Sequence, residues 1–286
     1  MIGGLLIDKP VGWTSHDVVA VVRRQLGTRS VGHAGTLDPF ATGLLVVLVG
    51  RATRLARFVE AMTKRYEAVA RLGAVTDTDD LTGTVTAHWD GTDWPPVGAV
   101  TEALQAFVGE TRQRPPAYSA KHVDGVRSHA LARAGVAVEL EPVQVRVHDM
   151  ALRDYSPPDV SFTATVGRGT YVRAIARDLG EHLGTGAHCA ALRRTATGGF
   201  DVADAIAPQD ASALALMPPA AVVPHLPRRV LTADELRAVG FGRAVPIEPQ
   251  VRGTIALVAD DGRLIAVAEA RDDDHAHPVV VLEPAA

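Results

Sequence analysis

The chain has a single cysteine, Cys189, among its 286 residues. One cysteine excludes an internal disulfide and any zinc site built from several cysteines. No apolar run reaches the roughly 18 residues that a membrane-spanning helix needs. The first ten residues lack the basic start and the apolar stretch of a signal peptide. We therefore expect a cytoplasmic protein without a membrane span.

Lysine is also scarce, since three Lys accompany 26 Arg. The net charge of −4 argues against a nucleic-acid partner, but the charges are unevenly distributed. Residues 1–71 carry ten Lys or Arg against five Asp or Glu, whereas residues 72–100 carry five Asp and no Lys or Arg. Polyanion binding depends on local basic surface rather than on the total charge. Charge alone leaves RNA binding and ordinary sequence variation equally open.

Helical and strand-like segments alternate irregularly, which favours a mixed α/β fold. Thr14 or Ser15 can cap a helix that reaches Leu26 and ends at Gly27. Residues 44–49 are wholly apolar and bounded by glycines, which indicates a buried strand. Further strands are expected at 4–8, 66–72, 143–153 and 160–166, and further helices at 51–62, 97–108 and 171–183, the last with Thr170 as its cap.

Prolines between 218 and 227 indicate a linker, after which the composition changes. Residues 253–270 read as two strands around an Asp-Gly turn, and residues 277–284 add a third. We expect a β-rich unit of about 60 residues at this end of the chain. Residues 112–135 are polar and basic and form an excursion from the core, of the kind that often carries function.

Asp38 lies in the stretch GHAGTLDPFATGLL, residues 32–45. Asp-Pro is a common turn dipeptide, so a plain loop is one interpretation. The other is a reactive carboxylate, because Gly32 and Gly35 leave room for a large ligand and the following strand would hold the loop rigidly. The stretch lacks the lysine of a phosphate-binding loop, and the histidines lack metal-ligand spacing, so we expect no metal site.

Three more residues have both a structural and a functional interpretation. Tyr66 is either an ordinary strand aromatic or, flanked by Lys64 and Arg65, a platform for a stacked nucleobase. Tyr171 and Arg173 are either surface residues at a helix start or part of a site in which Arg173 pairs with a carboxylate and keeps it ionised.

Six ordered stretches resemble the bacterial tRNA pseudouridine-55 synthases, the TruB family. They are DKPVGWTSHDVV from residue 8, GHAGTLDPFATGLLVVLVGRATRL from 32, KRYEAVARLGAVTDTDDLTG from 64, RPPAYSAKHVDGVRSHALAR from 114, GRGTYVRAIARDLG from 167 and AALRRTATGGF from 190. Together they span about residues 8–200, and the ordered match of six motifs identifies the chain as resembling this family.

The resemblance implies a pseudouridine-synthase catalytic domain over residues 1–223, with a large, mainly antiparallel mixed sheet flanked by helices and an RNA-binding insertion at about 112–135. It implies a PUA-like RNA-binding domain over 228–286. The implied activity is isomerisation of uridine 55 in the T-loop of tRNA, on a flipped-out base, with no cofactor or metal. The sequence does not give the oligomeric state, and we expect a monomer without an obligate protein partner.

The same resemblance assigns roles to residues. Asp38 matches the catalytic aspartate, Arg173 its ion-pair partner, and Tyr66 the tyrosine that stacks on the target base. The residues that it places against the RNA substrate are His33, in the gap left by the flipped base, Tyr171 in the active site, and Leu192 on the wall of the uracil pocket. Apart from the resemblance, we expect Gly32, which leaves room for RNA, and Lys64, which flanks Tyr66, to bind substrate as well.

Two features depart from the family pattern. YSAKH, residues 118–122, lacks an apolar residue that commonly precedes the lysine, which leaves the roles of Lys121 and His122 open. Residues 228–286 carry seven Arg against ten Asp or Glu, so their RNA binding rests on position and strand pattern. A tRNA-binding or chaperone module without catalysis is the alternative function. A nucleoside hydrolase is a third, disfavoured because Asp38 has no companion carboxylate in its motif.

Overall fold

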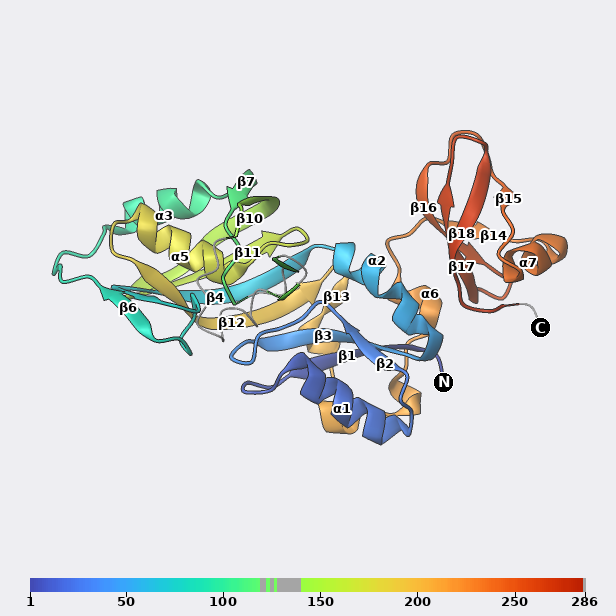
Figure 1. Ribbon diagram of the computed structural model, residues 1–286, viewed down its shortest axis with the longest axis horizontal. Coiled ribbons are helices and arrows are strands. Elements are labelled where there is room, and N and C mark those ends of the chain that lie inside the picture. Colours follow the sequence, from blue (N-terminus) through green and yellow to red (C-terminus); the bar gives the residue numbers. More distant parts are fainter. Residues whose placement is uncertain (119–121, 124–125, 128–139, 285–286) are drawn as a thin grey trace.

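The structure, a computed structural model, describes residues 1–118, 122–123, 126–127 and 140–284 (Figure 1). Its largest sheet has nine strands in the described chain. The main path is β1 (Gly3–Lys9), β3 (Thr42–Val49), β12 (Ala187–Thr197), β4 (Lys64–Leu72), β11 (Asp159–Val166), β10 (Val143–Ser156) and β7 (Gly109–Gln113), with β2 (Val31–Ala34) on β3 and β13 (Phe200–Asp201) on β12. Only β3 and β12 pair in parallel among these strands, so the expected mixed, mainly antiparallel sheet is confirmed.

Helix α1 (Ser15–Leu26) begins as the sequence predicts. The Thr14 side chain accepts a hydrogen bond from the Asp17 N–H, and the Asp17 carboxylate caps Thr14 in return. Gly27 ends the helix in the left-handed conformation, with φ of 59°. The expected helix at 51–62 is instead a 3₁₀ segment, η1 (Gly50–Leu55), followed by the short α2 (Ala56–Ala61).

Helices α3 (Val97–Gln105) and α5 (Val172–His182) lie together at the β10–β11 end of the sheet, whereas α1 lies beside the β1–β3 end (Figure 1). Thr170 does not cap α5, because Tyr171 is the residue at the cap position and the buried Thr170 hydroxyl has no hydrogen-bond partner among the described residues. The small hairpins are β5 (Ala74–Thr76) with β6 (Val85–His88), and β8 (His122–Val123) with β9 (Val126–Arg127).

A second, five-stranded sheet follows at the C-terminal end, as expected. Its order is β14 (Arg228–Val230), β16 (Gly253–Val258), β17 (Leu264–Ala270), β18 (His275–Val281) and β15 (Val245–Pro246). The sequence reading missed α7 (Ala233–Gly240), although Thr232 and Glu235 form a capping box at its start. In the sequence, four short helices connect the strands of the first sheet to those of the second. They are η2 (Val202–Asp204), η3 (Pro208–Asp210), η4 (Ala213–Ala215) and α6 (Pro219–Val222).

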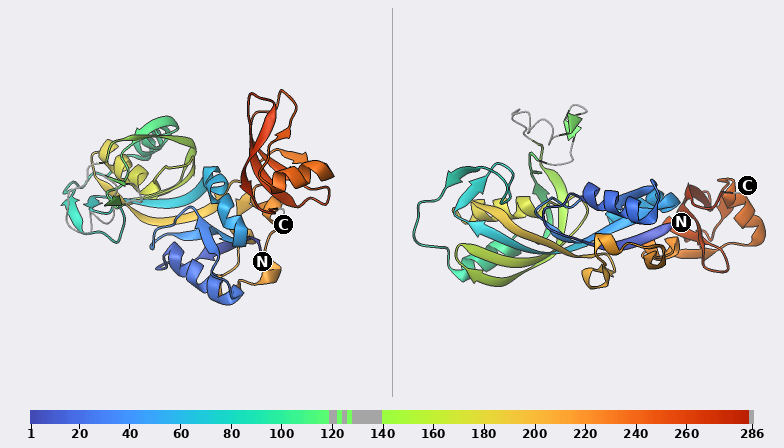
Figure 2. Two further views of the ribbon diagram at one scale, coloured as in Figure 1. Left: turned by 45° about the vertical axis from the view of Figure 1, so that its right-hand side comes forward. Right: turned by 90° about the horizontal axis from the view of Figure 1, so that it is seen from below.

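The two sheets share a hydrophobic core. One buried cluster joins side chains of β3, η1 and α2 to side chains of β16, β17 and β18, and it includes Leu48, Leu55, Val258 and Leu282. The C-terminal sheet therefore packs on the end of the molecule that carries the N-terminus (Figures 1 and 2). None of the helices in the described ranges is long and apolar enough to cross a membrane.

Candidate active site

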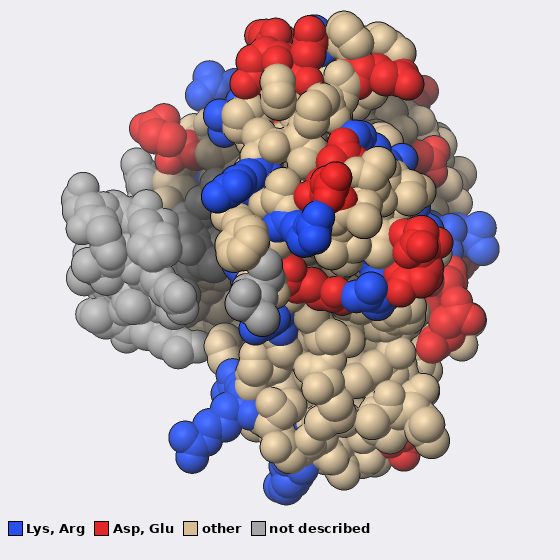
Figure 3. Space-filling view, turned by 90° about the vertical axis from the view of Figure 1, so that its right-hand side faces the viewer, with Lys and Arg blue, Asp and Glu red and all other residues tan. Residues whose placement is uncertain are grey.

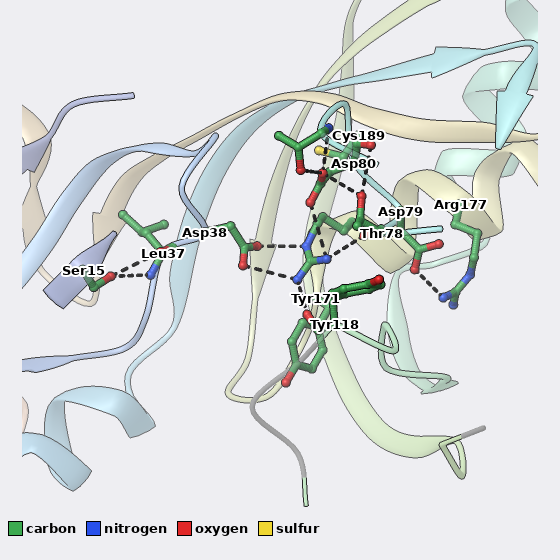
Figure 4. Close-up of polar contacts among 12 residues, drawn as sticks. Ser15, Leu37, Asp38, Thr78, Asp79, Asp80, Tyr118, Tyr171, Arg177 and Cys189 are labelled. Carbon is green, nitrogen blue, oxygen red and sulfur yellow. Dashed lines mark hydrogen bonds and ion pairs between the residues drawn. The ribbon is translucent and has the colours of Figure 1, made fainter. Parts of the chain in front are cut away.

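Asp38 lies on the loop between β2 and β3, in the turn that its Asp-Pro dipeptide predicts. The Ala41 N–H donates to the Asp38 carbonyl at 3.1 Å. One residue earlier, the Leu37 N–H donates to the Ser15 hydroxyl at 2.9 Å, and that hydroxyl donates to the Leu37 carbonyl at 3.2 Å (Figure 4). The first residue of α1 thus fixes the loop beside Asp38.

Two buried cations, Lys9 and Arg194, hold the Asp38 loop through hydrogen bonds to backbone carbonyls. The Lys9 ammonium donates to the carbonyls of Trp13 at 2.6 Å and Pro39 at 3.4 Å, so it holds the residue after Asp38. The Arg194 guanidinium donates to the carbonyls of Gly35 at 3.0 Å and of Leu44, just beyond the loop, at 2.6 Å. Burial lowers the pKa of Lys9 to about 8, although the Asp38 carboxylate opposes the shift. Asp38 therefore sits on a rigid, electropositive support.

Arg173, from the first turn of α5, meets Asp38 directly. Its Nε lies 2.9 Å from Asp38 Oδ2 in an ion pair, and its Nη2 donates to Asp38 Oδ1 at 3.3 Å. The same guanidinium donates to the carbonyls of Thr78 at 2.6 Å and Tyr118 at 2.9 Å. Asp80 lies on its other side, with Oδ2 3.5 Å from Nη1 (Figure 4). Five contacts to four residues determine where this guanidinium points.

The two members of the pair differ in exposure. The Asp38 side chain is 34% exposed, whereas the Arg173 side chain is 4% exposed. Desolvation raises the pKa of Asp38 above its usual value, the positive charge of Arg173 lowers it, and the nearby Asp80 carboxylate raises it. Arg173 therefore favours the ionised form of a carboxylate whose surroundings disfavour ionisation. The arrangement presents a carboxylate to a ligand and hides the group that keeps it charged.

Tyr66 and Leu192 lie on the strands next to this loop. In the sheet register, Gly43 of β3 pairs with Arg194 of β12, and Arg194 pairs with Tyr66 of β4. The loop enters β3 at this level, so Tyr66 lies two strands away from its end. Leu192 and Tyr66 belong to one hydrophobic cluster, with exposed fractions of 8% and 9%. The register brings the two predicted base-contacting residues to the sheet level of the Asp38 loop.

Lys64 is placed differently from what a contact with RNA requires. It is buried on the same face of β4 as Tyr66, and its ammonium donates to the carbonyls of Glu60 and Met62. Burial lowers its pKa to about 8. These bonds favour a structural role for Lys64 at the junction of α2 and β4 over the predicted contact with substrate.

His33 lies on β2, one residue after Gly32. Its ring packs edge-on against that of His16, with centroids 5.6 Å apart, and burial lowers its pKa to about 4. Its Nδ1 is buried and has no hydrogen-bond partner among the described residues. His33 is therefore a neutral ring at physiological pH. Gly32 has space around it, since an added Cβ would meet only the Thr53 methyl group, at 3.7 Å.

Tyr171 stands at the start of α5, two residues before Arg173. Its N–H donates to the Gln113 side chain at 2.9 Å, and its carbonyl accepts from the same amide at 3.1 Å. The structure thus connects Asp38, Arg173 and Tyr171 through α5, and places Tyr66 and Leu192 on the neighbouring strands. Lys121 lies outside the described residues, as does the side chain of His122, and their predicted roles stay open.

Sequence reasoning missed four residues that support the site, namely Lys9, Ser15, Asp80 and Arg194. One signal could have identified Lys9: in a chain that uses Arg for nearly every cation, each lysine is conspicuous. No such signal marks Asp80 or Arg194, because their partners are distant in the sequence. Within the described residues, no three His, Cys, Asp or Glu side chains lie together as metal ligands would.

Three family models together match residues 23–283. Residues 23–172 match the TruB family pseudouridylate synthase (N terminal domain), residues 173–232 the tRNA pseudouridylate synthase B C-terminal domain, and residues 226–283 the tRNA pseudouridine synthase II C-terminal model.

Individual proteins agree with the family models. The tRNA pseudouridine synthase B of Thermobifida fusca is 45% identical over 98% of both chains. That of Solibacter usitatus is 40% identical over 99% of this chain and all of the relative. A solved Cbf5–Nop10–Gar1 complex contains a chain with a TM-score of 0.72 and 28% identity, covering 94% of this chain and 78% of that one.

Proposed function

The chain belongs to the TruB family of pseudouridylate synthases, and on that premise we propose that Asp38 is the nucleophile with which it works. Its reaction is the isomerisation of a uridine in tRNA to pseudouridine. We propose uridine 55 of the T-loop as the target, since the six motifs match synthases of that position. The observation that carries the assignment is the ion pair between the partly exposed Asp38 carboxylate and the buried Arg173.

The reaction breaks the N1–C1′ bond of uridine, turns the uracil ring and rejoins it to C1′ through C5. C5 loses its proton and N1 gains one, so the atoms of substrate and product balance. Nothing is oxidised and no water is consumed, so one ionised carboxylate can start the reaction by attacking the base or the sugar, or by removing a sugar proton. Arg173 helps to keep Asp38 ionised, because its positive charge opposes the rise in pKa that desolvation causes. Lys9 and Arg194 hold the loop, so the carboxylate does not have to be reoriented when the substrate arrives.

The target base is stacked inside a folded loop and must leave it, which costs a few kcal/mol. We assign Tyr66 to stacking on the extruded uracil, which returns roughly 1–3 kcal/mol, and Leu192 to the apolar wall of the same pocket. His33 is assigned to the space that the base vacates. Its neutral, edge-packed ring suits insertion between bases better than a charged ring would. Gly32 provides close approach for the RNA, and Tyr171 lines the pocket beside Arg173.

We further propose that residues 1–223 form the catalytic domain and residues 228–286 a PUA-like domain, because the two sheets divide there. The tRNA is the partner, and we assign the enzyme to the cytoplasm, as a monomer without an obligate protein partner. Exposed arginines without an ion-pair partner in the described chain, such as Arg24, Arg29 and Arg168, suit contacts with tRNA phosphates.

The test uses Asp38→Asn on a T-arm stem-loop, with pseudouridine mapped by position. We expect formation to fall below detection while the dissociation constant for tRNA stays within a few-fold of the wild-type value. Asp159→Asn is the matched control, because Asp159 also pairs with an arginine, Arg71, at 2.8 Å but belongs to β11 away from the site. It should keep full activity.

Three outcomes would contradict the proposal. Pseudouridine formation by Asp38→Asn would show that Asp38 is not the nucleophile. Tight tRNA binding by a wild-type protein that makes no pseudouridine would favour the non-catalytic module. Free uracil as the product would indicate a hydrolase.

A further inference from the structure

Gln113 is the last residue of β7 and is 3% exposed. Its amide binds both polar groups of one backbone residue: Oε1 accepts from the Tyr171 N–H at 2.9 Å, and Nε2 donates to the Tyr171 carbonyl at 3.1 Å. The opposite orientation of the amide would face donor with donor and acceptor with acceptor. Gln113 therefore holds Tyr171 as a neighbouring strand residue would.

Helix α5 has no side-chain cap of its own. Tyr171 at the cap position offers no oxygen in the place where Ser, Thr or Asp would, and Thr170 does not supply one. The start of the helix is instead fixed from outside, by Gln113. Arg173 follows two residues later, in the first turn, so the clamp on Tyr171 acts very near the guanidinium that meets Asp38.

Two residues that follow Gln113 accept hydrogen bonds from side chains of α5. Arg177 donates to the Arg114 carbonyl at 2.9 Å, and Arg173 donates to the Tyr118 carbonyl at 2.9 Å. Three consecutive attachments therefore join the end of β7 and the segment that follows it to the helix that carries Arg173. Figure 4 shows Tyr118 and Tyr171 beside the guanidinium that bonds to Asp38.

We propose that Gln113 is a positioning residue for pseudouridine formation, which sets the start of α5 and thereby aims Arg173 at Asp38. The proposal rests on the roles given above to Asp38 and Arg173. A loosened α5 start lets the guanidinium move away from the carboxylate, which forms no other ion pair within the described residues. Desolvation then raises the pKa of Asp38 further, and the enzyme loses its ionised nucleophile at a higher pH than before.

The charged groups around Asp38 are few enough to interpret a pH profile. Arg173 faces it from α5, Asp80 from the turn after β5, and Lys9 from the end of β1, with Arg194 behind Lys9. Lys9, with its pKa near 8, titrates on the alkaline side.

Further along α5, Arg177 pairs with Asp79 and Asp178, whose pKa values are also raised by burial. Asp79→Asn and Asp178→Asn in the same assay each remove one of these titrations, so an acid limb that both variants leave in place belongs to neither group.

The experiment measures single-turnover rates of pseudouridine formation against pH for the wild type and for Gln113→Met, which keeps the volume but has no amide. We expect the rate at neutral pH to fall about tenfold, as for the loss of two hydrogen bonds. We expect the acid limb to move to higher pH and the KM for tRNA to stay within about threefold. Gln113→Glu keeps the bond from the Tyr171 N–H. Its rate and its acid limb should therefore lie between those of the wild type and those of Gln113→Met.

Gln105→Ala is the matched control, because the Gln105 amide also donates to a backbone carbonyl, that of Met150, at 2.7 Å, but holds α3 rather than α5. It should lower the melting temperature without moving the acid limb. An unmoved limb in Gln113→Met, or loss of folding in both Gln113 variants, would show that the clamp serves stability alone and would overturn the proposal. Failure of the proposed function is recognised separately, by activity in Asp38→Asn.

Discussion

Asp38 and Arg173 form an ion pair between a partly exposed and a buried side chain. The carboxylate reaches the surface where a substrate can meet it, whereas the guanidinium is held by the carbonyls of Thr78 and Tyr118 and by Asp80. Desolvation raises the pKa of the Asp38 carboxyl, and the positive charge of Arg173 limits the rise. On acidification, the activity should therefore be lost at a pH above the usual pKa of an aspartate side chain.

Arg173→Lys tests this balance. A lysine keeps one positive charge but cannot reproduce the planar fork that contacts Asp38, Asp80 and two carbonyls. The pKa of Asp38 rises further, so the acid limb of kcat against pH moves upward, and the rate at neutral pH falls by roughly tenfold to a hundredfold. Pseudouridine formation measured from pH 5 to pH 9 gives the limb. A lower rate with an unmoved limb would separate Arg173 from the ionisation of Asp38.

Tyr66→Phe tests whether the phenol hydroxyl takes part in the chemistry. That hydroxyl has no hydrogen-bond partner in the described part of the chain, so its removal should leave stability and tRNA affinity unchanged. If the hydroxyl assists removal of the C5 proton, kcat falls by roughly 10²-fold or more.

Tyr155→Phe provides the opposite signature as a control. Its hydroxyl donates to the Pro95 carbonyl at 2.8 Å, so the variant should lose about 1 kcal/mol of stability and keep its rate. A wild-type rate in Tyr66→Phe would reduce Tyr66 to a stacking platform.

At the scale of elements, the parallel contact between β3 and β12 holds the Asp38 loop in register. Gly43 has a φ of +100°, and a Cβ added there would lie 2.2 Å from the Arg194 carbonyl oxygen. The Arg194 side chain holds the Asp38 loop through the carbonyls of Gly35 and Leu44. A shift between β3 and β12 would therefore also move this loop.

Gly43→Ala should therefore lower the free energy of unfolding by at least about 2 kcal/mol, since it combines backbone strain with a backbone clash. Urea unfolding followed by circular dichroism measures the change. Gly32→Ala is the comparison, because its added methyl group meets nothing closer than 3.7 Å. It should keep wild-type stability and weaken tRNA binding if the RNA needs the space. Equal stability of the two variants would contradict the strand-pair argument.

Helix starts show where local sequence sufficed and where it did not. Thr14, one of the two caps expected for α1, does cap this helix, and its bonds with Asp17 span only three residues. The same reasoning gives Thr170 for α5 and is wrong, because the partner that holds this helix, Gln113, is 58 residues away. Short-range signals cannot register a contact of that span.

At the scale of the whole molecule, the two sheets share one of their cores. Leu282, 1% exposed, belongs to the cluster that also contains Leu48 and Leu55, and Arg54 donates to the carbonyl of Val281 at 2.7 Å. The C-terminal sheet should therefore unfold together with the N-terminal one. All three tryptophans lie in residues 13–94, so tryptophan fluorescence reports on the N-terminal part alone.

Leu282→Ala should lower the free energy of unfolding from the tryptophan-detected urea transition by about 2–5 kcal/mol, although Leu282 directly follows β18 of the C-terminal sheet. Leu214, which is fully exposed, provides the control, and Leu214→Ala should change stability by less than about 0.5 kcal/mol. A tryptophan transition that Leu282→Ala leaves in place would mean that the two sheets unfold independently.

Charge is distributed differently over the two parts. Arg229, Arg237, Arg252 and Arg263 form ion pairs with acidic residues of the C-terminal part. On the face seen in Figure 3, Asp and Glu are interspersed with Arg across the described residues. The positive charge that attracts tRNA is therefore expected mainly from the N-terminal part, where arginines outside the described ion pairs are more frequent.

The sequence by itself determined the family, the mixed α/β class and the β-rich C-terminal unit, and it predicted the roles proposed for Asp38, Tyr66 and Arg173. These follow from ordered motifs and local periodicity, which the chain carries in consecutive residues. The tertiary structure alone decided that Lys64 is buried, that Lys9 and Arg194 hold the Asp38 loop, and that Gln113 fixes the start of α5. Each of these depends on which side chain meets which backbone carbonyl across the fold, and the nearest-neighbour order of the chain does not contain that information.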